Sequence, residues 1–206
     1  MSKTVQTGLL VAFVVIAVSA LVYGLTGNNN SDQATAQSSE PQKVKILKYS
    51  DYQCPACKTY AAPVEQLKRE FGDMVEVEYK HFPLQSHRFA RLAGHAVEAA
   101  RNQGKFKEMH DLIFANQEVW SDGGARDYFI SYAEEIGLDT EQFKEDLESE
   151  EVHAIVEQNK QEGIRRQVNA TPTFFINGVK IRQNPQSYEQ LKAMVEMFMY
   201  RGNVSG

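Results

Sequence analysis

The stretch that decides the fold is residues 49–57, and it reads Tyr49-Ser50-Asp51-Tyr52-Gln53-Cys54-Pro55-Ala56-Cys57. It holds both cysteines of the 206-residue chain. Residues 43–49 first alternate between polar and apolar and then turn apolar, as a strand that enters a sheet does. Pro55 suits a first helical position, and apolar residues follow at helical spacing: Tyr60, Val64, Leu67 and Phe71. The pattern therefore predicts a strand, a short turn and a helix that begins beside Cys54.

Two thiols at the start of a helix indicate redox chemistry. The helix dipole and the free N–H groups of the first turn favour the thiolate of Cys54, so we expect Cys54 to be the nucleophile. Cys57 lies one turn further in, and we expect it to be shielded and to act as the resolving thiol. As a structural disulfide, a ring of about four residues would contribute only about 2 kcal/mol. Such a bond is suited to being made and broken.

A zinc site, which would need only two further ligands, is one alternative interpretation of the two cysteines, and an inert buried pair is the other. None of the histidines has a matching ligand pair at zinc-finger spacing, and each is expected to be a surface residue or a satisfied, partly buried one: His81, His87, His95, His110 and His153. We therefore expect no metal and no cofactor. Asp51 and Lys80 are candidates for tuning the cysteine pKa values, with solvated surface charges as the alternative.

The rest of the chain predicts a small mixed sheet with helices on both faces. A second strand is expected over residues 75–79 and a helical stretch over residues 86–167, with breaks at glycines. Residues 173–181 have Asn177-Gly178 between two apolar runs, a strong signal of a hairpin. A final helix has an apolar face that runs from Tyr188 to Phe198.

The N-terminal part differs from the rest. Residues 8–25 carry no charge and would span roughly 27 Å as a helix, at about 1.5 Å per residue, which is just long enough to cross a bilayer. A retained membrane anchor is one interpretation, and a cleaved signal peptide that ends near Ala20 is the other. Either one predicts that the remainder is exported. Lys3 precedes the apolar run and Asp32 and Glu40 follow it, so the positive-inside rule also places the remainder outside the cytoplasm. The polar residues 26–42 predict a flexible linker.

Charge and composition exclude one class of partner. The chain has 22 Lys plus Arg against 27 Asp plus Glu, so its formal net charge is −5. Binding to nucleic acid depends on clustered positive charge, and no cluster of Lys and Arg is present in the sequence. We therefore expect no nucleic-acid partner.

Two motifs together resemble those of the disulfide-bond protein A (DsbA) family: residues 49–57, quoted above, and Ala170-Thr171-Pro172-Thr173-Phe174-Phe175-Ile176-Asn177-Gly178. The resemblance covers residues 43–200 and implies an α/β, thioredoxin-like fold with an inserted helical domain. It also implies that Pro172 is a cis-proline that faces the cysteines, and that Thr171 and Pro172 bind an extended substrate segment. The implied organisation is a cytoplasmic N-terminus, an anchor or signal segment, a linker, and a thioredoxin-like domain in two parts around a helical insertion: residues 1–7, 8–25, 26–42, 43–85 with 168–206, and 86–167.

The resemblance implies a thiol:disulfide oxidoreductase, and the apolar run over residues 8–25 predicts that it is tethered on the extracytoplasmic side of the cell membrane. Its substrates would be exported proteins with cysteines, and a membrane redox partner would reset the cysteines. Two residues differ from DsbA itself: Ala56 stands in place of a histidine within the Cys-X-X-Cys motif, and Thr171 in place of a valine before the proline. An oxidase is the expected direction. A reductase or isomerase of the same fold, and a non-catalytic module that binds peptide or metal, are the alternatives.

Overall fold

The computed structural model describes residues 40–200 of the chain. The predicted anchor over residues 8–25 and most of the predicted linker lie outside these residues. Within residues 40–200, no helix is both long enough and apolar enough to cross a membrane. The end of the predicted linker is held in place, because the Gln42 N–H donates to the Met199 carbonyl at 2.8 Å.

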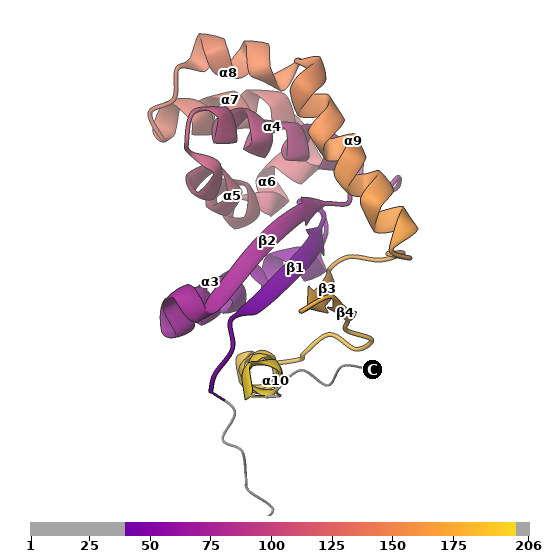
Figure 1. Cartoon of the computed structure of the whole chain (residues 1–206). Helices are drawn as coiled ribbons and strands as arrows, with labels where there is room; N and C mark the ends of the chain where they lie inside the picture. The colour runs from indigo at the N-terminus through magenta and orange to yellow at the C-terminus, as the bar shows by residue number, and fades with distance from the viewer. Residues whose placement is uncertain (1–39, 201–206) are drawn as a thin grey trace, which may run out of the picture. The chain divides into compact units, whose positions relative to one another are not determined.

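Four strands form one mixed sheet in the spatial order β2-β1-β3-β4 (Figure 1). Strands β1 and β2 are parallel, whereas β1 with β3 and β3 with β4 are antiparallel. The strand bounds are Val44–Ser50 for β1, Val75–His81 for β2, Thr173–Ile176 for β3 and Val179–Lys180 for β4. The predicted hairpin is confirmed: Asn177 and Gly178 both have positive φ, of 46° and 81°, which a two-residue turn of type I′ requires.

The helices fall into a group against the sheet and a group inserted between β2 and β3. Helices α2 and α3 follow β1, and α10 closes the described part; their bounds are Pro55–Thr59, Ala61–Phe71 and Tyr188–Tyr200. The insertion contains α4 (Ala90–Asn102), α5 (Phe106–Ala115), α6 (Gln117–Asp122), α7 (Ala125–Glu135), α8 (Thr140–Leu147) and α9 (Glu150–Arg165). A 3₁₀ turn, Gly72–Met74, leads into β2. The predicted thioredoxin-like architecture with a helical insertion is therefore observed.

The single helix predicted from Pro55 to Phe71 is wrong in one respect, because the structure divides it at Tyr60 into α2 and α3. Pro63 explains the break. A proline inside a helix has no N–H to donate, and its ring clashes with the carbonyl four residues earlier, here that of Thr59. Pro63 is instead tolerated in the first turn of a new helix.

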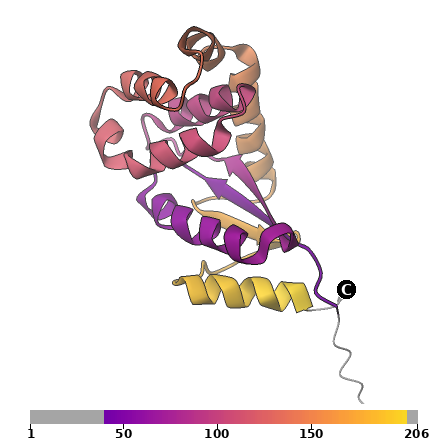
Figure 2. The same cartoon turned by 90° about the vertical axis from the view of Figure 1, so that its left-hand side faces the viewer.

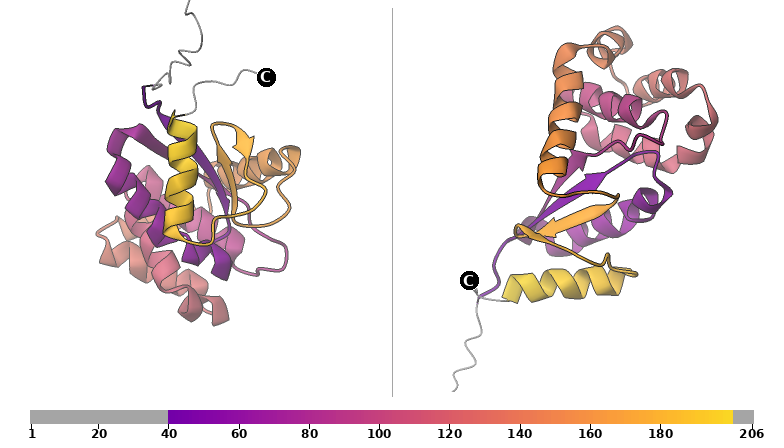
Figure 3. Two further views of the ribbon diagram at one scale, coloured as in Figure 1. Left: turned by 90° about the horizontal axis from the view of Figure 1, so that it is seen from below. Right: turned by 90° about the vertical axis from the view of Figure 1, so that its right-hand side faces the viewer.

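Helices cover both faces of the sheet, as predicted. On one face α3 and α10 lie side by side (Figures 2 and 3), and their apolar residues pack with those of β1 and β3 around Ile46, Leu67 and Phe174. On the other face, α9 approaches closely at Gly163, where an added Cβ would lie 2.6 Å from the Phe82 ring. Helices α4 to α8 stand beyond the carboxyl ends of β1 and β2 in Figure 1. Their apolar residues form one buried cluster with Tyr52, Cys54 and Cys57, so the cysteine motif lies where the sheet meets the insertion.

Candidate functional site

The loop between β1 and α2 is anchored by the buried carboxylate of Asp51. This carboxylate accepts hydrogen bonds from the Gln53 N–H at 2.7 Å and the Leu84 N–H at 2.8 Å, and it bonds His87 Nδ1 at 2.8 Å. Leu84 and His87 belong to the segment after β2, so Asp51 joins the ends of the two parallel strands. A satisfied buried carboxylate of this kind fixes the loop that positions Cys54.

A second anchor comes from the helical insertion. The side-chain amide of Gln117, at the start of α6, donates to the Tyr52 carbonyl at 2.7 Å and to the Cys54 carbonyl at 3.0 Å. Gln117 is itself buried. Sequence reasoning missed this residue, because a glutamine about 60 positions after the motif carries no local signal.

Cys54 is the N-cap residue of α2, as predicted, and Pro55 is the first residue of the helix. Pro55 and Ala56 are exposed, Cys54 is 7% exposed, and Cys57 is fully buried. The Asp51 N–H lies 3.4 Å from Cys57 Sγ and donates to it. The two sulfurs therefore have unequal access: one is at the edge of the surface and the other is beneath it.

The pKa values of the two thiols move in opposite directions. A hydrogen bond from Cys57 lowers the pKa of Cys54 to about 5, against the opposing effect of burial, and the Thr171 side chain and the N–H groups of Cys57 and Ala56 add to the lowering. Burial raises the pKa of the Cys57 thiol far above its ordinary range, and the neighbouring Cys54 thiolate adds to this effect. At neutral pH the reduced pair therefore carries its negative charge on Cys54.

The segment before β3 meets Cys54 across 117 positions of sequence. Cys54 Sγ lies 3.5 Å from the Thr171 carbonyl oxygen, to which it donates when Cys54 is protonated. The Thr171–Pro172 peptide bond is cis, as predicted. Pro172 is buried, Thr171 is half-buried, and the Asn184 side chain donates to the Pro172 carbonyl at 2.7 Å. The structure thus brings together the predicted site residues Cys54, Cys57, Thr171 and Pro172.

A lysine missed by the sequence reasoning lies beneath this site. Lys48, in β1, is fully buried, and among the described residues its Nζ has no hydrogen-bond partner. Burial lowers the pKa of Lys48 to about 8, against the opposing effect of Cys57, Glu65 and Cys54. Lys80, the lysine proposed from the sequence, forms ion pairs with Glu78 and Glu162 instead. The sequence did hold a signal for the burial of Lys48, because this lysine stands among the apolar residues at the end of the predicted first strand.

The predicted environment of the histidines is wrong for His81 and His110, which are buried. His81 bonds the buried Glu98 at 2.6 Å, and His110 Nδ1 lies 2.7 Å from the Tyr52 hydroxyl. Hydrogen bonding within a packed interior made their burial possible. The rings of two other histidines, His95 and His153, stack with 4.0 Å between their centroids. Among the described residues, no three His, Cys, Asp or Glu side chains are grouped so that they could hold a metal ion.

Comparison with known proteins agrees with this geometry. The model of the thioredoxin family matches residues 33–197. A thioredoxin-like oxidoreductase from Silicibacter pomeroyi is 26% identical, with a TM-score of 0.66, and the match covers 80% of this chain and 91% of that one. DsbA2 of Pseudomonas aeruginosa is 22% identical with a TM-score of 0.58, over 77% of this chain and 90% of the other, and shows the same fold.

Curated relatives share only a part of their length with this chain. The Na⁺/H⁺ antiporter NhaA of Herminiimonas arsenicoxydans is 34% identical over 143 residues, which are 69% of this chain and 22% of the relative. The chain thus spans about a fifth of the length of the curated relatives it matches. The chain belongs to the thioredoxin family, and within it has the fold and the Cys-X-X-Cys pair of the DsbA-like thiol:disulfide oxidoreductases.

Proposed function

We propose that this chain is an extracytoplasmic thiol:disulfide oxidoreductase in which Cys54 is the nucleophile and Cys57 the resolving thiol. The observation that carries the proposal is the opposite shift of the two cysteine pKa values. Cys54 is a thiolate at neutral pH beside the surface, and Cys57 is a protonated thiol beneath it. This division of roles is what disulfide exchange through a mixed disulfide requires.

The proposed reaction forms a disulfide in the substrate. A substrate thiolate attacks Cys54 Sγ of the Cys54–Cys57 disulfide, and Cys57 leaves and takes up a proton. A second substrate thiolate then attacks the substrate sulfur of the mixed disulfide, and Cys54 leaves as a thiolate. The substrate loses two electrons and gains a disulfide, and the cysteine pair is reduced. A thiolate of low pKa leaves readily, so the second step is favoured.

Stabilisation of the Cys54 thiolate supports the oxidase direction. Anything that stabilises the reduced pair makes its disulfide a stronger oxidant. Ala56 supplies no imidazole, but its N–H and that of Cys57 contribute to the low pKa of Cys54, as does the Cys57 thiol. A reductase or isomerase remains the competing direction. A reduction potential well above thioredoxin's roughly −270 mV supports the oxidase, and one near or below that value supports the reductase.

The proposed substrates are exported proteins that present a cysteine in an extended segment. The Thr171 carbonyl is a backbone acceptor that lies 3.5 Å from the reacting Cys54 Sγ. An extended segment that pairs with Thr171 would place its cysteine against Cys54. The proposal includes tethering through residues 8–25 and a membrane redox partner that resets the pair.

Trapping tests the function. In a Cys57→Ala variant the mixed disulfide cannot be resolved, so disulfide-linked adducts should accumulate with a reduced, unfolded, cysteine-containing test protein and oxidised glutathione. A Cys54→Ser variant is the matched control and should form none. A Cys57→Ala variant that forms no adduct, while its Cys54 still reacts with an alkylating agent, would argue for the non-catalytic module. A peptide holder would work without Cys54, and a metal carrier would bind stoichiometric zinc or copper.

A further inference from the structure

Two histidines meet where α4 packs against α9, away from the cysteine pair. The rings of His95, in α4, and His153, in α9, stack with 4.0 Å between their centroids and an angle of 23° between their planes. Both side chains are half-buried. His153 Nε2 also donates to the carbonyl of Leu147, the last residue of α8, at 3.0 Å. The stack therefore joins three helices of the insertion.

The junction around the stack is packed closely. At Gly94, the residue before His95, an added Cβ would lie 3.3 Å from Val156 of α9 and 3.3 Å from His81 Nδ1 of β2. Val156 is fully buried. Packed interfaces of this kind do not deform gradually, so a change in one ring leaves the two helices either in contact or apart.

The protonation of His95 is coupled to this packing. Burial lowers the pKa of His95 from its ordinary value of 6.5 to about 4, and the neighbouring His153 adds to the lowering. At pH 7 the ring of His95 is therefore neutral. Between about pH 6.5 and pH 4, an opened chain holds a proton on His95 that the closed chain excludes. Acid in this range therefore favours opening.

The groups around His95 give its proton little compensation. Positive or titratable groups on three elements oppose the protonation of His95: His153 of α9, His81 of β2 and Arg91 of α4. Glu148, which follows α8, favours it. This carboxylate is already held by Arg126 of α7 in an ion pair. A charged His95 is thus poorly accommodated at the closed junction.

Helix α9 leads from the stack to the cysteine site, as Figure 1 shows in its course from α8 to the segment before β3. The Asn159 side chain accepts the N–H of the last residue of β2 at 3.1 Å. Beyond the helix, the Val168 N–H donates to the Gly163 carbonyl at 2.8 Å. Three residues later, the Thr171 carbonyl lies 3.5 Å from Cys54 Sγ. The position of α9 therefore bears on the segment that faces the reacting sulfur.

We propose that the His95–His153 stack is an acid-sensitive latch: it holds α9 against α4 at neutral pH, and proton uptake by His95 parts the two helices and loosens the Thr171 segment beside Cys54. The proton comes from solvent, which the half-buried ring of His95 reaches. Histidine pairs at packed interfaces can act as pH switches in this way. The latch itself needs no redox chemistry, whereas its effect on disulfide exchange rests on the proposed function.

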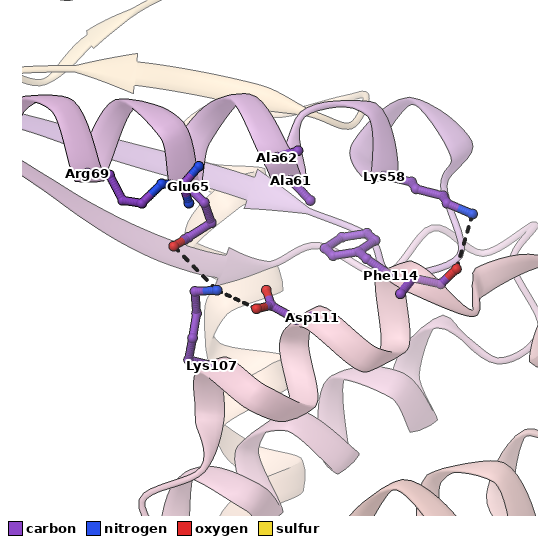
Figure 4. Close-up of a pocket in the computed structure, with 9 residues that line it drawn as sticks. Lys58, Ala61, Ala62, Glu65, Arg69, Lys107, Asp111 and Phe114 are labelled. Carbon is purple, nitrogen blue, oxygen red and sulfur yellow. Dashed lines mark hydrogen bonds and ion pairs between the residues drawn. The ribbon is translucent and has the colours of Figure 1, made fainter. Parts of the chain in front are cut away.

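A second junction of the insertion differs in chemistry. Figure 4 shows Lys107 of α5 between Glu65 of α3 and Asp111, and it forms ion pairs with both. Lys107, Glu65 and Asp111 line a cavity of about 340 Å³. Against the opposing effect of burial, hydrogen bonds from Tyr79 and Lys68 hold the pKa of Glu65 below its ordinary value of 4.5. The ion pair between α3 and α5 therefore persists over the pH range in which the latch opens.

Hydrogen–deuterium exchange of the full chain at pH 7 and pH 5, corrected for the intrinsic effect of pH on amide exchange, tests the latch. The protection of the α9 amides should fall about tenfold between the two pH values, because the opened state takes up a proton. At pH 5 the α9 amides should be less protected than those of α3, because the junction opens without the rest of the fold. Equal protection of the two helices would mean that the whole chain unfolds, and would overturn the latch.

Two variants locate the effect. His95→Phe keeps an aromatic ring in the stack but takes up no proton, so the protection of the α9 amides should change by less than about threefold between pH 7 and pH 5. Lys107→Met is the matched control, because it removes the ion pairs of the other junction. It should leave the fall in α9 protection in place. A fall in His95→Phe as large as that in the unchanged chain would rule out His95 as the switch.

A measurement on the unchanged chain covers the case in which His95→Phe does not fold. In chain labelled with ¹³C-histidine, the ring resonance of His95 should titrate with a midpoint near 4. A midpoint near the ordinary 6.5 would mean that the closed junction does not exclude the proton, and would overturn the latch.

The effect on disulfide exchange has a separate measurement. The oxidised chain reacts with a cysteine-containing peptide or with glutathione at pH 7 and pH 5, and the ratio of the two rates is compared. In the unchanged chain the preference for the peptide should fall at least about threefold at pH 5, because the peptide loses its backbone partner at Thr171. In His95→Phe the ratio should stay constant. No reaction with either thiol would indicate failure of the proposed function, whereas unchanged α9 protection would indicate failure of the latch alone.

Discussion

The two sides of the cysteine pair are built differently. On the outer side, Cys54 lies at the surface edge beside the Thr171 carbonyl, with backbone N–H groups around its sulfur. On the inner side, Cys57 is fully buried, and Lys48 and His110 are buried as well. The two sides differ in the exposure of the sulfur, and among the described residues each holds a buried polar atom without a hydrogen-bond partner, such as Thr171 Oγ1 on the outer side and Lys48 Nζ on the inner side.

The difference shows how one disulfide gains two unlike sulfurs. Hydrogen bonds to a thiolate lower its pKa, and burial raises it. Cys54 and Cys57 are three residues apart, so their environments must diverge within one helical turn. The start of α2 achieves this, because the turn that presents Cys54 to backbone N–H groups directs Cys57 toward the packed helices of the insertion.

The largest expected effect is the contrast in reactivity between the two thiols. At pH 7, iodoacetamide should modify Cys54 in a Cys57→Ala variant at least about a hundredfold faster than Cys57 in a Cys54→Ala variant. Cys54 lies at the edge of the site, 7% exposed, and retains the N–H groups that favour its thiolate, whereas Cys57 is fully buried and protonated. Mass spectrometry of timed samples measures both rates.

The same reaction in concentrated urea is the control, and there the two thiols should react at similar rates. Equal rates in the folded variants would mean that the fold does not divide the roles of the cysteines.

The next effect concerns the contact of the helical insertion with the loop that carries Cys54. Gln117→Ala removes the side-chain amide that donates to the Tyr52 and Cys54 carbonyls, so both carbonyls lose that hydrogen bond. The free energy of unfolding should fall by about 1–3 kcal/mol, the usual cost of an unsatisfied buried polar group. Urea denaturation followed by circular dichroism measures the change.

Gln161→Ala is the matched control, because the Gln161 side-chain amide donates at 2.7 Å to the side chain of Glu157 on the helix surface. It should change the free energy of unfolding by less than about 0.5 kcal/mol. Equal losses of free energy of unfolding in the two variants would show that Gln117 does not anchor the cysteine motif.

The smallest effect is a bend in the reduction potential against pH. Below about pH 5 both thiols of the reduced pair are protonated, so two electrons carry two protons and the potential falls by about 60 mV per pH unit. Above the lowered pKa of Cys54 only Cys57 takes a proton, and the fall should be about 30 mV per pH unit. Equilibration with glutathione or dithiothreitol buffers measures this. A bend near pH 9 instead would show that Cys54 is an ordinary thiol.

Much of the fold could be predicted from the sequence where the signal was local. The strand, turn and helix around residues 49–57 and the Asn177-Gly178 hairpin follow from periodicity and turn chemistry over a few residues. The helical insertion was predicted as one stretch, and its glycine breaks match the ends of helices in the structure. The division at Tyr60 was missed, although Pro63 provided the signal.

The sequence by itself determined the cysteine pair, the helix that begins at it and the second motif around Thr171 and Pro172, because each is specified by neighbouring residues. Only the tertiary structure decided what surrounds them. The contact of Cys54 with Thr171 spans 117 positions, and that of Gln117 with the Cys54 carbonyl spans 63. The burial of Lys48 depends on packing by α5, which follows β1 at a large separation in the sequence. Such contacts arise from sheet order and helix packing, and no local pattern encodes them.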